Sequence, residues 1–314
     1  MKRVKAVAPY IHPEFLNFKI APYEAWKRIG GQVAEAHYPA RIFHGFAFRW
    51  ELPTLWKNKK EARLRFVEPV SLSFDTFPDY ARYEIIPFVW DCWPRYFERM
   101  CRWLEKHEVK TAIFTSSQTA DVFKQKIPQL NVLWCPEAIS TELYKPGFQL
   151  KERVVDILEF GRQSGLTMHF NNSSINVVYT KKNNDFIYTT EQLYDLLQNT
   201  KVAIAFPRSI TQPDVAGGIE TLTQRYWECM LSRCLMIGHC PKELINLIGY
   251  NPVVELQIDS DNVSETLMTI LNNITDYQEL VDKNRETALI MGDWNKRIIQ
   301  VQQWLSAHGY IIYK

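Results

Sequence analysis

The stretch "GGIETLTQRYWECM", residues 217–230, combines residue types that can bind a charged, hydroxyl-rich ligand. Two carboxylates, Glu220 and Glu228, stand with seven residues between them, and Arg225 lies inside that spacing. A carboxylate accepts hydrogen bonds from sugar hydroxyls, and a guanidinium presents donors that match phosphate oxygens. The combination indicates a ligand with phosphate in its middle and polyols on both sides, as in a nucleotide-sugar. The alternative is that the carboxylates only complement a helix dipole and that Arg225 is a surface residue.

The same stretch also predicts the start of a helix. Thr221 and Gln224 have the spacing of a capping box, which places the first helical turn at about Leu222. The free amides and the positive dipole end of such a turn favour a bound anion, typically a phosphate. The glycine pair Gly217 and Gly218 would let the backbone approach that anion closely.

Elements that could position these residues recur along the whole chain. Short apolar runs such as "KVAIAFP" alternate with amphipathic, helix-like segments such as "YEAWKRIGGQVAEA" (23–36) and "TTEQLYDLLQNT", and three helices at about 262–273, 276–291 and 293–307 close the chain. Strands that alternate with helices favour parallel sheets covered on both faces. The segment Lys145-Pro146-Gly147 is the best domain boundary.

We therefore expect an α/β protein of two Rossmann-like domains, residues 1–147 and 148–314, with parallel sheets facing each other across a cleft. The cleft is the expected ligand site, since such sheets bind at the carboxyl ends of their strands. The last helix is a candidate to pack back against the N-terminal domain.

Composition excludes several classes of protein. Of 314 residues, 37 are Lys or Arg and 35 are Asp or Glu, so no overall field favours nucleic-acid binding. No apolar run reaches the roughly 18 residues that a membrane span needs. Six cysteines form no CxxC pair and fall in expected core elements, which is typical of reduced thiols in a cytoplasmic protein. The nearby Cys229, Cys234, His239 and Cys240 do not have the usual spacing of zinc ligands, so a metal there is not expected.

Four features in order resemble one family. The Glu220-x7-Glu228 spacing is similar to the E-x7-E motif of the group 1 (retaining, glycogen-synthase-like) glycosyltransferases of the GT-B fold. "PEAISTELYKP" (136–146) resembles the interdomain segment of that family, "ILEFGR" (157–162) its first donor-domain strand, and "YWECMLSRCLMIGHCPKEL" (226–244) the elements that follow its motif.

The resemblance implies a glycosyltransferase that moves a sugar from a nucleotide-sugar donor, with retention, and without a cofactor or an obligatory metal. Glu228 would bind the donor ribose, Glu220 would contact the donor sugar, and Arg162 would neutralise the diphosphate. Acceptor chemistry would fall to the N-terminal domain. The expected donor-binding set is Glu228, Gly217, Gly218, Ile219, Thr221, Arg208 and Arg225.

The sequence departs from the family at one charged position. The family usually carries a lysine about five residues after the arginine of its Gly-Arg pair, and here Thr167 occupies that place. Lys181 or Lys182 could replace the lysine, or Arg208 and Arg225 could supply the charge. We prefer the two arginines because both are expected at strand or helix ends beside the motif.

Two residues of the N-terminal domain are candidates for the acceptor side of the reaction. Asp91 follows an apolar strand and could orient or deprotonate an acceptor hydroxyl, or it could simply cap the next helix. His44 could contact the donor sugar or be structural. If either residue were a general base, the reaction could invert the anomeric centre.

The acceptor itself is expected to be a glycan or a lipid-linked glycan in polysaccharide or glycoconjugate biosynthesis. Residues 41–66 mix aromatic and basic side chains, so they are a candidate surface for peripheral contact with the inner face of a membrane. We favour the simpler interpretation of a core strand followed by a solvated basic turn. Two further alternatives are a glycosyltransferase that modifies DNA or protein, and a non-catalytic module that only binds a nucleotide-sugar.

Overall fold

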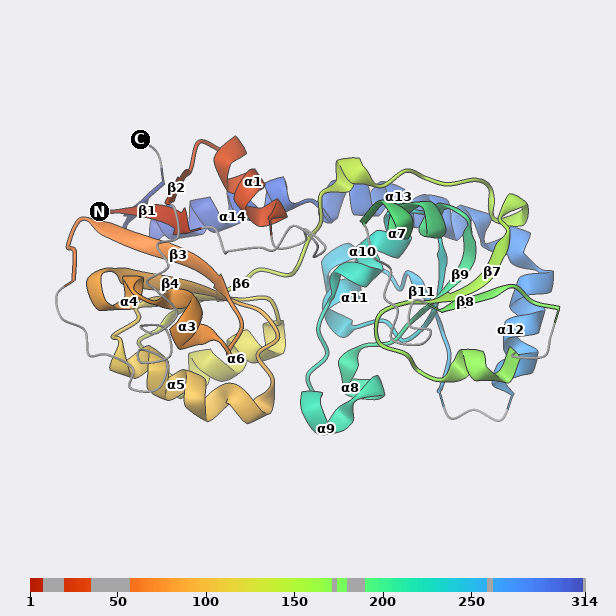
Figure 1. Cartoon of the computed structure of the whole chain (residues 1–314), viewed down its shortest axis with the longest axis horizontal. Coiled ribbons are helices and arrows are strands. Elements are labelled where there is room, and N and C mark those ends of the chain that lie inside the picture. The colour runs from red at the N-terminus through yellow and green to blue at the C-terminus, as the bar shows by residue number, and fades with distance from the viewer. Residues whose placement is uncertain (8–19, 35–56, 171–173, 180–189, 259–261, 313–314) are drawn as a thin grey trace. The chain divides into compact units, whose positions relative to one another are not determined.

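The computed structural model describes residues 1–7, 20–34, 57–170, 174–179, 190–258 and 262–312 (Figure 1). Contacts divide the chain into two compact units. Of the described residues, one unit contains those before Glu137 together with residues 294–312, and the other contains those from Glu137 to Asp293. The second unit therefore begins at Glu137 where the sequence suggested residue 148, and the last helix belongs to the first unit.

The first unit is built on a parallel sheet with the strand order β12-β1-β3-β4-β5-β6, and β2 also pairs with β1. Its strands are β1 (Lys2–Val7), β2 (Gln32–Ala34), β3 (Glu61–Val67), β4 (Glu84–Val89), β5 (Thr111–Phe114), β6 (Asn131–Trp134) and β12 (Tyr310–Ile311). Its helices are α1 (Ala21–Arg28), α3 (Leu72–Thr76), α4 (Asp79–Arg82), η2 (Pro94–Tyr96), α5 (Phe97–Lys106), α6 (Ser117–Lys126) and α14 (Trp294–Ala307).

The second unit is built on a parallel sheet with the order β11-β10-β9-β7-β8. Its strands are β7 (Val155–Glu159), β8 (Val177–Tyr179), β9 (Thr200–Ala205), β10 (Leu235–Gly238) and β11 (Val253–Glu255). Its helices are η3 (Thr141–Leu143), η4 (Leu150–Glu152), η5 (Leu166–Phe170), α7 (Thr190–Gln198), α8 (Arg208–Thr211), α9 (Pro213–Ala216), α10 (Gln224–Leu231), α11 (Lys242–Ile248), α12 (Val263–Asn272), η6 (Ile274–Tyr277) and α13 (Gln278–Met291).

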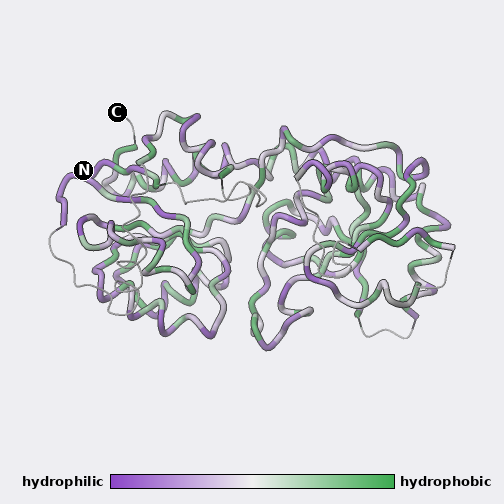
Figure 2. Tube along the Cα trace, viewed as in Figure 1, coloured by the Kyte–Doolittle hydropathy of each residue, from purple (hydrophilic) through white to green (hydrophobic). Residues whose placement is uncertain are grey.

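Both faces of the second sheet are buried because its strands are apolar on both sides. In β9, Ala203 and Ala205 pack into a cluster with α7, α10 and α11, while Val202 and Ile204 pack into a second cluster with α12 and η6. Successive side chains of a strand point to opposite faces, so one continuous apolar run fills two cores. Figure 2 shows these strands as hydrophobic segments of the chain.

A buried arginine holds the start of the second unit together. The Arg153 guanidinium, 2% exposed, donates to the backbone carbonyls of Phe148 (2.9 Å), Thr200 (2.7 Å) and Ser232 (2.9 Å). Gly147 has a φ of +67°, and a Cβ there would lie 2.9 Å from an Arg153 nitrogen. The predicted boundary glycine is thus needed for the turn that brings this arginine inward.

The expected α/β architecture with two parallel sheets is confirmed, but three local predictions are wrong. The helix expected over 23–36 ends at Arg28, and the chain then forms β2. Helix α10 begins at Gln224 with Thr223 as its N-cap, so the Thr221–Gln224 capping box does not form. The basic end of segment 41–66, expected as a solvated turn, continues into strand β3 over Glu61–Val67.

The C-terminal strand is fixed to the first sheet by a buried polar cluster. The Tyr310 hydroxyl donates to Glu84 at the start of β4 and lies 3.0 Å from the Thr111 hydroxyl, while Lys2 forms an ion pair with Glu84.

None of the helices in the described ranges is long and apolar enough to cross a lipid bilayer. All six cysteines are buried free thiols, which confirms their expected core positions.

Candidate functional site

The strand order of the second sheet marks its expected binding edge. The chain runs from β7 to its neighbour β8, and then returns to place β9 on the other side of β7. Ligands of such sheets bind at the carboxyl ends of the strands where the order reverses. Gly161 and Arg162 follow β7 at this edge, and Phe206, Pro207 and Arg208 follow β9.

Arg225 on α10 packs against the turn that follows β7. Gly161 has a φ of +72°, and a Cβ on it would collide with the Arg225 guanidinium. The same guanidinium lies 5.1 Å from the ring centre of Phe160, a cation–π distance. The structure therefore brings the Gly-Arg turn and the helix of the E-x7-E motif together, although they are far apart in sequence.

A buried carboxylate shapes the rest of this turn. Glu159, the last residue of β7, is 1% exposed and accepts hydrogen bonds from the Ser164 amide, from the Ser164 hydroxyl (2.5 Å) and from the Thr167 hydroxyl. The Thr167 carbonyl in turn accepts from the Tyr179 hydroxyl at 2.8 Å. Thr167 is fully buried, so the residue at the family's lysine position serves the loop itself.

Glu228 lies one turn after Arg225 on α10 and is partly buried. The Tyr144 hydroxyl donates to Glu228 Oε1 at 3.0 Å, and the Tyr144 ring makes an edge contact with Tyr194. Burial raises the pKa of Glu228, while the hydrogen bond from Tyr144 and the charge of Arg225 act in the opposite direction. The carboxylate is thus held in place with one oxygen engaged.

Glu220 precedes α10 in the loop and is also partly buried. Its Oε1 lies 3.3 Å from His239 Nε2, and its Oε2 accepts from the Lys242 amide at 3.4 Å. The following loop is fixed by Glu243, which accepts from the Leu222 amide at 2.9 Å. Sequence reasoning missed the roles of His239, Glu243 and Tyr144, although His239 and Glu243 follow an apolar strand at its carboxyl end, where ligand-binding residues collect.

The remaining predicted donor-binding residues surround Glu220 and β9. Gly217 ends α9 with a φ of +56°, and an added Cβ on the exposed Gly218 would meet open space. Ile219 and Thr221 are both buried, at 8% and 6% exposure, so their side chains do not line an open surface. Arg208 begins α8, and its Nε donates to the Gln212 side chain at 2.9 Å.

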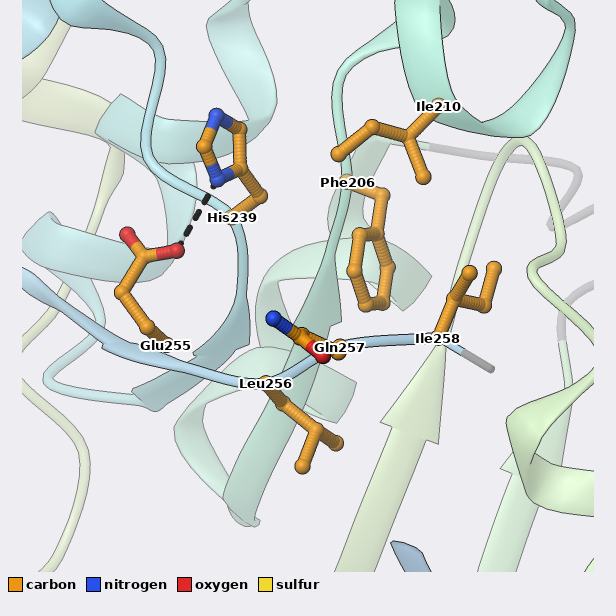
Figure 3. Close-up of a pocket in the computed structure, with 7 residues that line it drawn as sticks. All are labelled: Phe206, Ile210, His239, Glu255, Leu256, Gln257 and Ile258. Carbon is orange, nitrogen blue, oxygen red and sulfur yellow. Dashed lines mark hydrogen bonds and ion pairs between the residues drawn. The ribbon is translucent and has the colours of Figure 1, made fainter. Parts of the chain in front are cut away.

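A cavity of about 580 Å³ lies at the carboxyl ends of β9, β10 and β11 (Figure 3). His239 and Glu255 form its polar side, with Gln257 between them and an apolar wall. The residues that line it are Phe206, Ile210, His239, Glu255, Leu256, Gln257 and Ile258. The cavity therefore shares His239 with the immediate surroundings of Glu220.

The candidates of the N-terminal half are only partly described. Asp91 is exposed after β4, with a φ of +49°, and the N-caps of η2 and α5 are Trp93 and Tyr96. The interpretation of Asp91 as a helix cap is therefore wrong. His44 lies outside the described residues, as do the two lysine candidates of the second half, Lys181 and Lys182.

The basic and aromatic segment 41–66 is described only from residue 57. Arg63 and Arg65 lie on β3 and are 7% and 5% exposed, and they pair with Glu61 and Asp79 respectively. Counting these two arginines as part of a solvent-facing surface is wrong, because both side chains are buried on β3.

Solved structures with the GT-B fold of glycosyltransferases are similar to this chain. HepE of Anabaena, in complex with UDP and glucose, has a TM-score of 0.62 at 9% identity over 98% of this chain and 100% of its own. A glycosyltransferase from Rickettsia africae has a TM-score of 0.54 at 10% identity over 98% and 99%. The GT-B fold implied by the sequence resemblance is confirmed.

A third neighbour, TarM of S. aureus, has a TM-score of 0.53 at 10% identity over 78% of this chain and 55% of its own length, so the chain spans about half of TarM. That structure holds fondaparinux, alpha-GlcNAc-glycerol and UDP. No protein-family model and no curated protein matches the sequence. At these identities the likeness establishes the fold.

Proposed function

We propose that this protein is a glycosyltransferase that moves a sugar from a nucleotide-sugar donor to a glycan or lipid-linked glycan acceptor, with retention and without an obligatory metal. One observation carries the proposal: the Arg225 guanidinium packs against Gly161, the residue before Arg162, in the turn that follows β7. Arg208 follows the neighbouring strand at the same edge.

Three guanidiniums at this edge suit a diphosphate. Negative charge grows on the departing diphosphate as the glycosidic bond breaks, and positive groups that are already in position stabilise it without reorganisation. Guanidiniums also bind phosphate oxygens through paired hydrogen bonds. Arg162, Arg208 and Arg225 would therefore take the part that a metal ion plays in other transferases.

The two carboxylates suit the hydroxyl groups at the ends of the donor. Glu228 has one oxygen engaged by Tyr144 and would use the other for the ribose hydroxyls, while Glu220 would accept from the transferred sugar. The UDP and glucose bound to HepE support a donor of this chemistry. We propose Asp91 for the acceptor side, because its left-handed backbone holds an exposed carboxylate at the end of β4, and strain of that kind often marks a functional site.

Thermal-shift and calorimetric titrations with UDP, GDP and ADP and their glucose derivatives would test this proposal. The matching nucleotide should raise the melting temperature by mass action. Slow release of nucleoside diphosphate from the matching sugar would then separate a transferase from a binding module. A protein that binds no member of this panel would contradict the proposed function.

A further inference from the structure

We propose that His239 is a positioning residue that holds Glu220 in the orientation in which it binds the donor sugar. This inference rests on the proposed function, because it assigns His239 a role in the sugar end of the same site. His239 would act through its contact with Glu220, and it does not need to contact the diphosphate.

The imidazole of His239 lies between two carboxylates. Its Nδ1 is 2.9 Å from Glu255 Oε2 (Figure 3). Its Nε2 is 3.3 Å from Glu220 Oε1, so the ring lies within hydrogen-bond distance of both carboxylates and connects the end of β11 to the E-x7-E loop. The ring is 31% exposed and Glu220 22%, so both side chains are partly accessible to solvent.

The backbone of His239 is fixed on both sides of its Cα. Its amide donates to the Ala205 carbonyl at 2.9 Å, and its carbonyl accepts from the Tyr226 hydroxyl at 2.7 Å. Gly238 before it has a φ of +144°, and a Cβ at Gly238 would collide with the Ala205 carbonyl. The bend after β10 therefore fixes the backbone from which the imidazole projects.

Glu255 is anchored from its other oxygen. Its Oε1 accepts from the Asn251 side chain at 2.8 Å and from the Cys240 amide at 3.0 Å, which leaves Oε2 for His239. A connected set of hydrogen bonds thus runs from the end of β11 to Glu220. Such networks fix the orientation of side chains that contact substrate.

The donor sugar would bind Glu220 beside its contacts with His239 and Lys242. These contacts are long, 3.3 Å to the His239 ring and 3.4 Å to the Lys242 amide, and a carboxylate oxygen can accept more than one hydrogen bond. Glu228 receives its hydrogen bond from Tyr144 instead. Removal of the imidazole should therefore disturb the sugar end of the site and leave the nucleoside diphosphate end intact.

Calorimetry with the nucleoside diphosphate that the wild-type protein binds best in the panel above, and with its glucose derivative, tests this separation. In His239→Ala the affinity for the nucleotide-glucose should fall about fivefold, the size of one lost hydrogen bond, while the affinity for the nucleoside diphosphate stays within about twofold. His239→Gln, whose amide can donate towards Glu220, should recover part of the loss. His308→Ala, which removes an exposed histidine bonded to the Trp304 carbonyl, is the matched control and should change neither affinity.

Equal weakening of both ligands in His239→Ala would overturn the proposal, because it would mean that His239 only supports the fold. Unchanged affinity for both ligands would overturn it as well. Failure of the wild-type protein to bind any nucleotide of the panel would remove the proposed function and this inference together, whereas the first two outcomes leave the proposed function standing.

Discussion

The guanidinium of Arg225 occupies the space where a side chain on Gly161 would have to be. In Gly161→Ala the new methyl group must therefore displace the Arg225 guanidinium. The alanine must also adopt the left-handed backbone conformation of Gly161. We expect a loss of stability of about 1–2 kcal/mol from the backbone alone. The displaced Arg225 guanidinium could no longer donate to the diphosphate. The affinity for the nucleoside diphosphate, measured by calorimetry, should therefore fall at least tenfold.

Gly165→Ala is the matched control for that experiment. Gly165 lies in the same loop with a φ of +85°, but an added Cβ there meets no atom within 4 Å. The melting temperature of Gly165→Ala should fall by an amount similar to that of Gly161→Ala, while its affinity for the nucleotide is retained. Equal loss of affinity in both variants would show that the backbone, and not Arg225, is what the ligand requires.

Arg162 can be examined through the rate of donor breakdown. If Arg162 stabilises the departing diphosphate, Arg162→Ala should lower the rate of nucleoside diphosphate release by a factor of roughly 100, with a much smaller change in KM. Arg162→Lys keeps the charge but not the paired donors. Its rate of nucleoside diphosphate release should therefore lie between the rates of the wild-type protein and of Arg162→Ala. A rate equal to the wild-type rate in Arg162→Ala would remove this residue from the mechanism.

The architecture could be predicted from the sequence because it follows from local patterns. Apolar runs such as 201–207 alternate with amphipathic helices, and this alternation implies parallel sheets covered on both faces. Local start signals were weaker. Thr221 and Gln224 have capping spacing, yet the Leu222 amide is taken by the buried Glu243, and the helix begins only at Gln224.

The partners of the candidate site could not be predicted, because they come from distant parts of the chain. Tyr144 reaches Glu228 from the segment before β7, and Glu255 reaches His239 from the end of β11. Neither pairing leaves a spacing signal in one sequence. The same limit applies to β3, where Arg63 and Arg65 look like a solvated turn until their acidic partners are placed beside them.

Glu228 is expected to cost stability in the free protein. Burial raises its pKa above the ordinary value of 4.5, so its contribution to stability is present below that value and is lost as pH rises through the raised pKa. Glu228→Gln removes this cost. At pH 7 the free energy of unfolding of Glu228→Gln should exceed that of the wild-type protein by about 0.5–2 kcal/mol, a gain typical of stabilising substitutions.

The same variant should bind the nucleoside diphosphate more weakly, by about 1–3 kcal/mol, since the carboxylate charge and one acceptor for ribose hydroxyls are lost. Urea denaturation at several pH values measures the first effect and calorimetry the second. The stability gain should vanish as pH falls towards 4.5. A gain that persists there would show that the buried charge is not its origin.

Tyr144→Phe should weaken binding at the nucleoside end of the site, because Tyr144 acts on the ligand through Glu228 and not by direct contact. The Tyr144 hydroxyl donates to Glu228 at 3.0 Å, so its loss frees the carboxylate to rotate, and affinity for the nucleoside diphosphate should fall about fivefold, as for one hydrogen bond. Tyr250→Phe is the control in the same unit, because the Tyr250 hydroxyl bonds Asn284 and Thr287 away from the site. Both variants should lose about 1 kcal/mol of stability by urea denaturation, and only Tyr144→Phe should lose affinity. If Tyr250→Phe weakened binding to the same degree, general loosening of the unit would explain the result in place of the contact with Glu228.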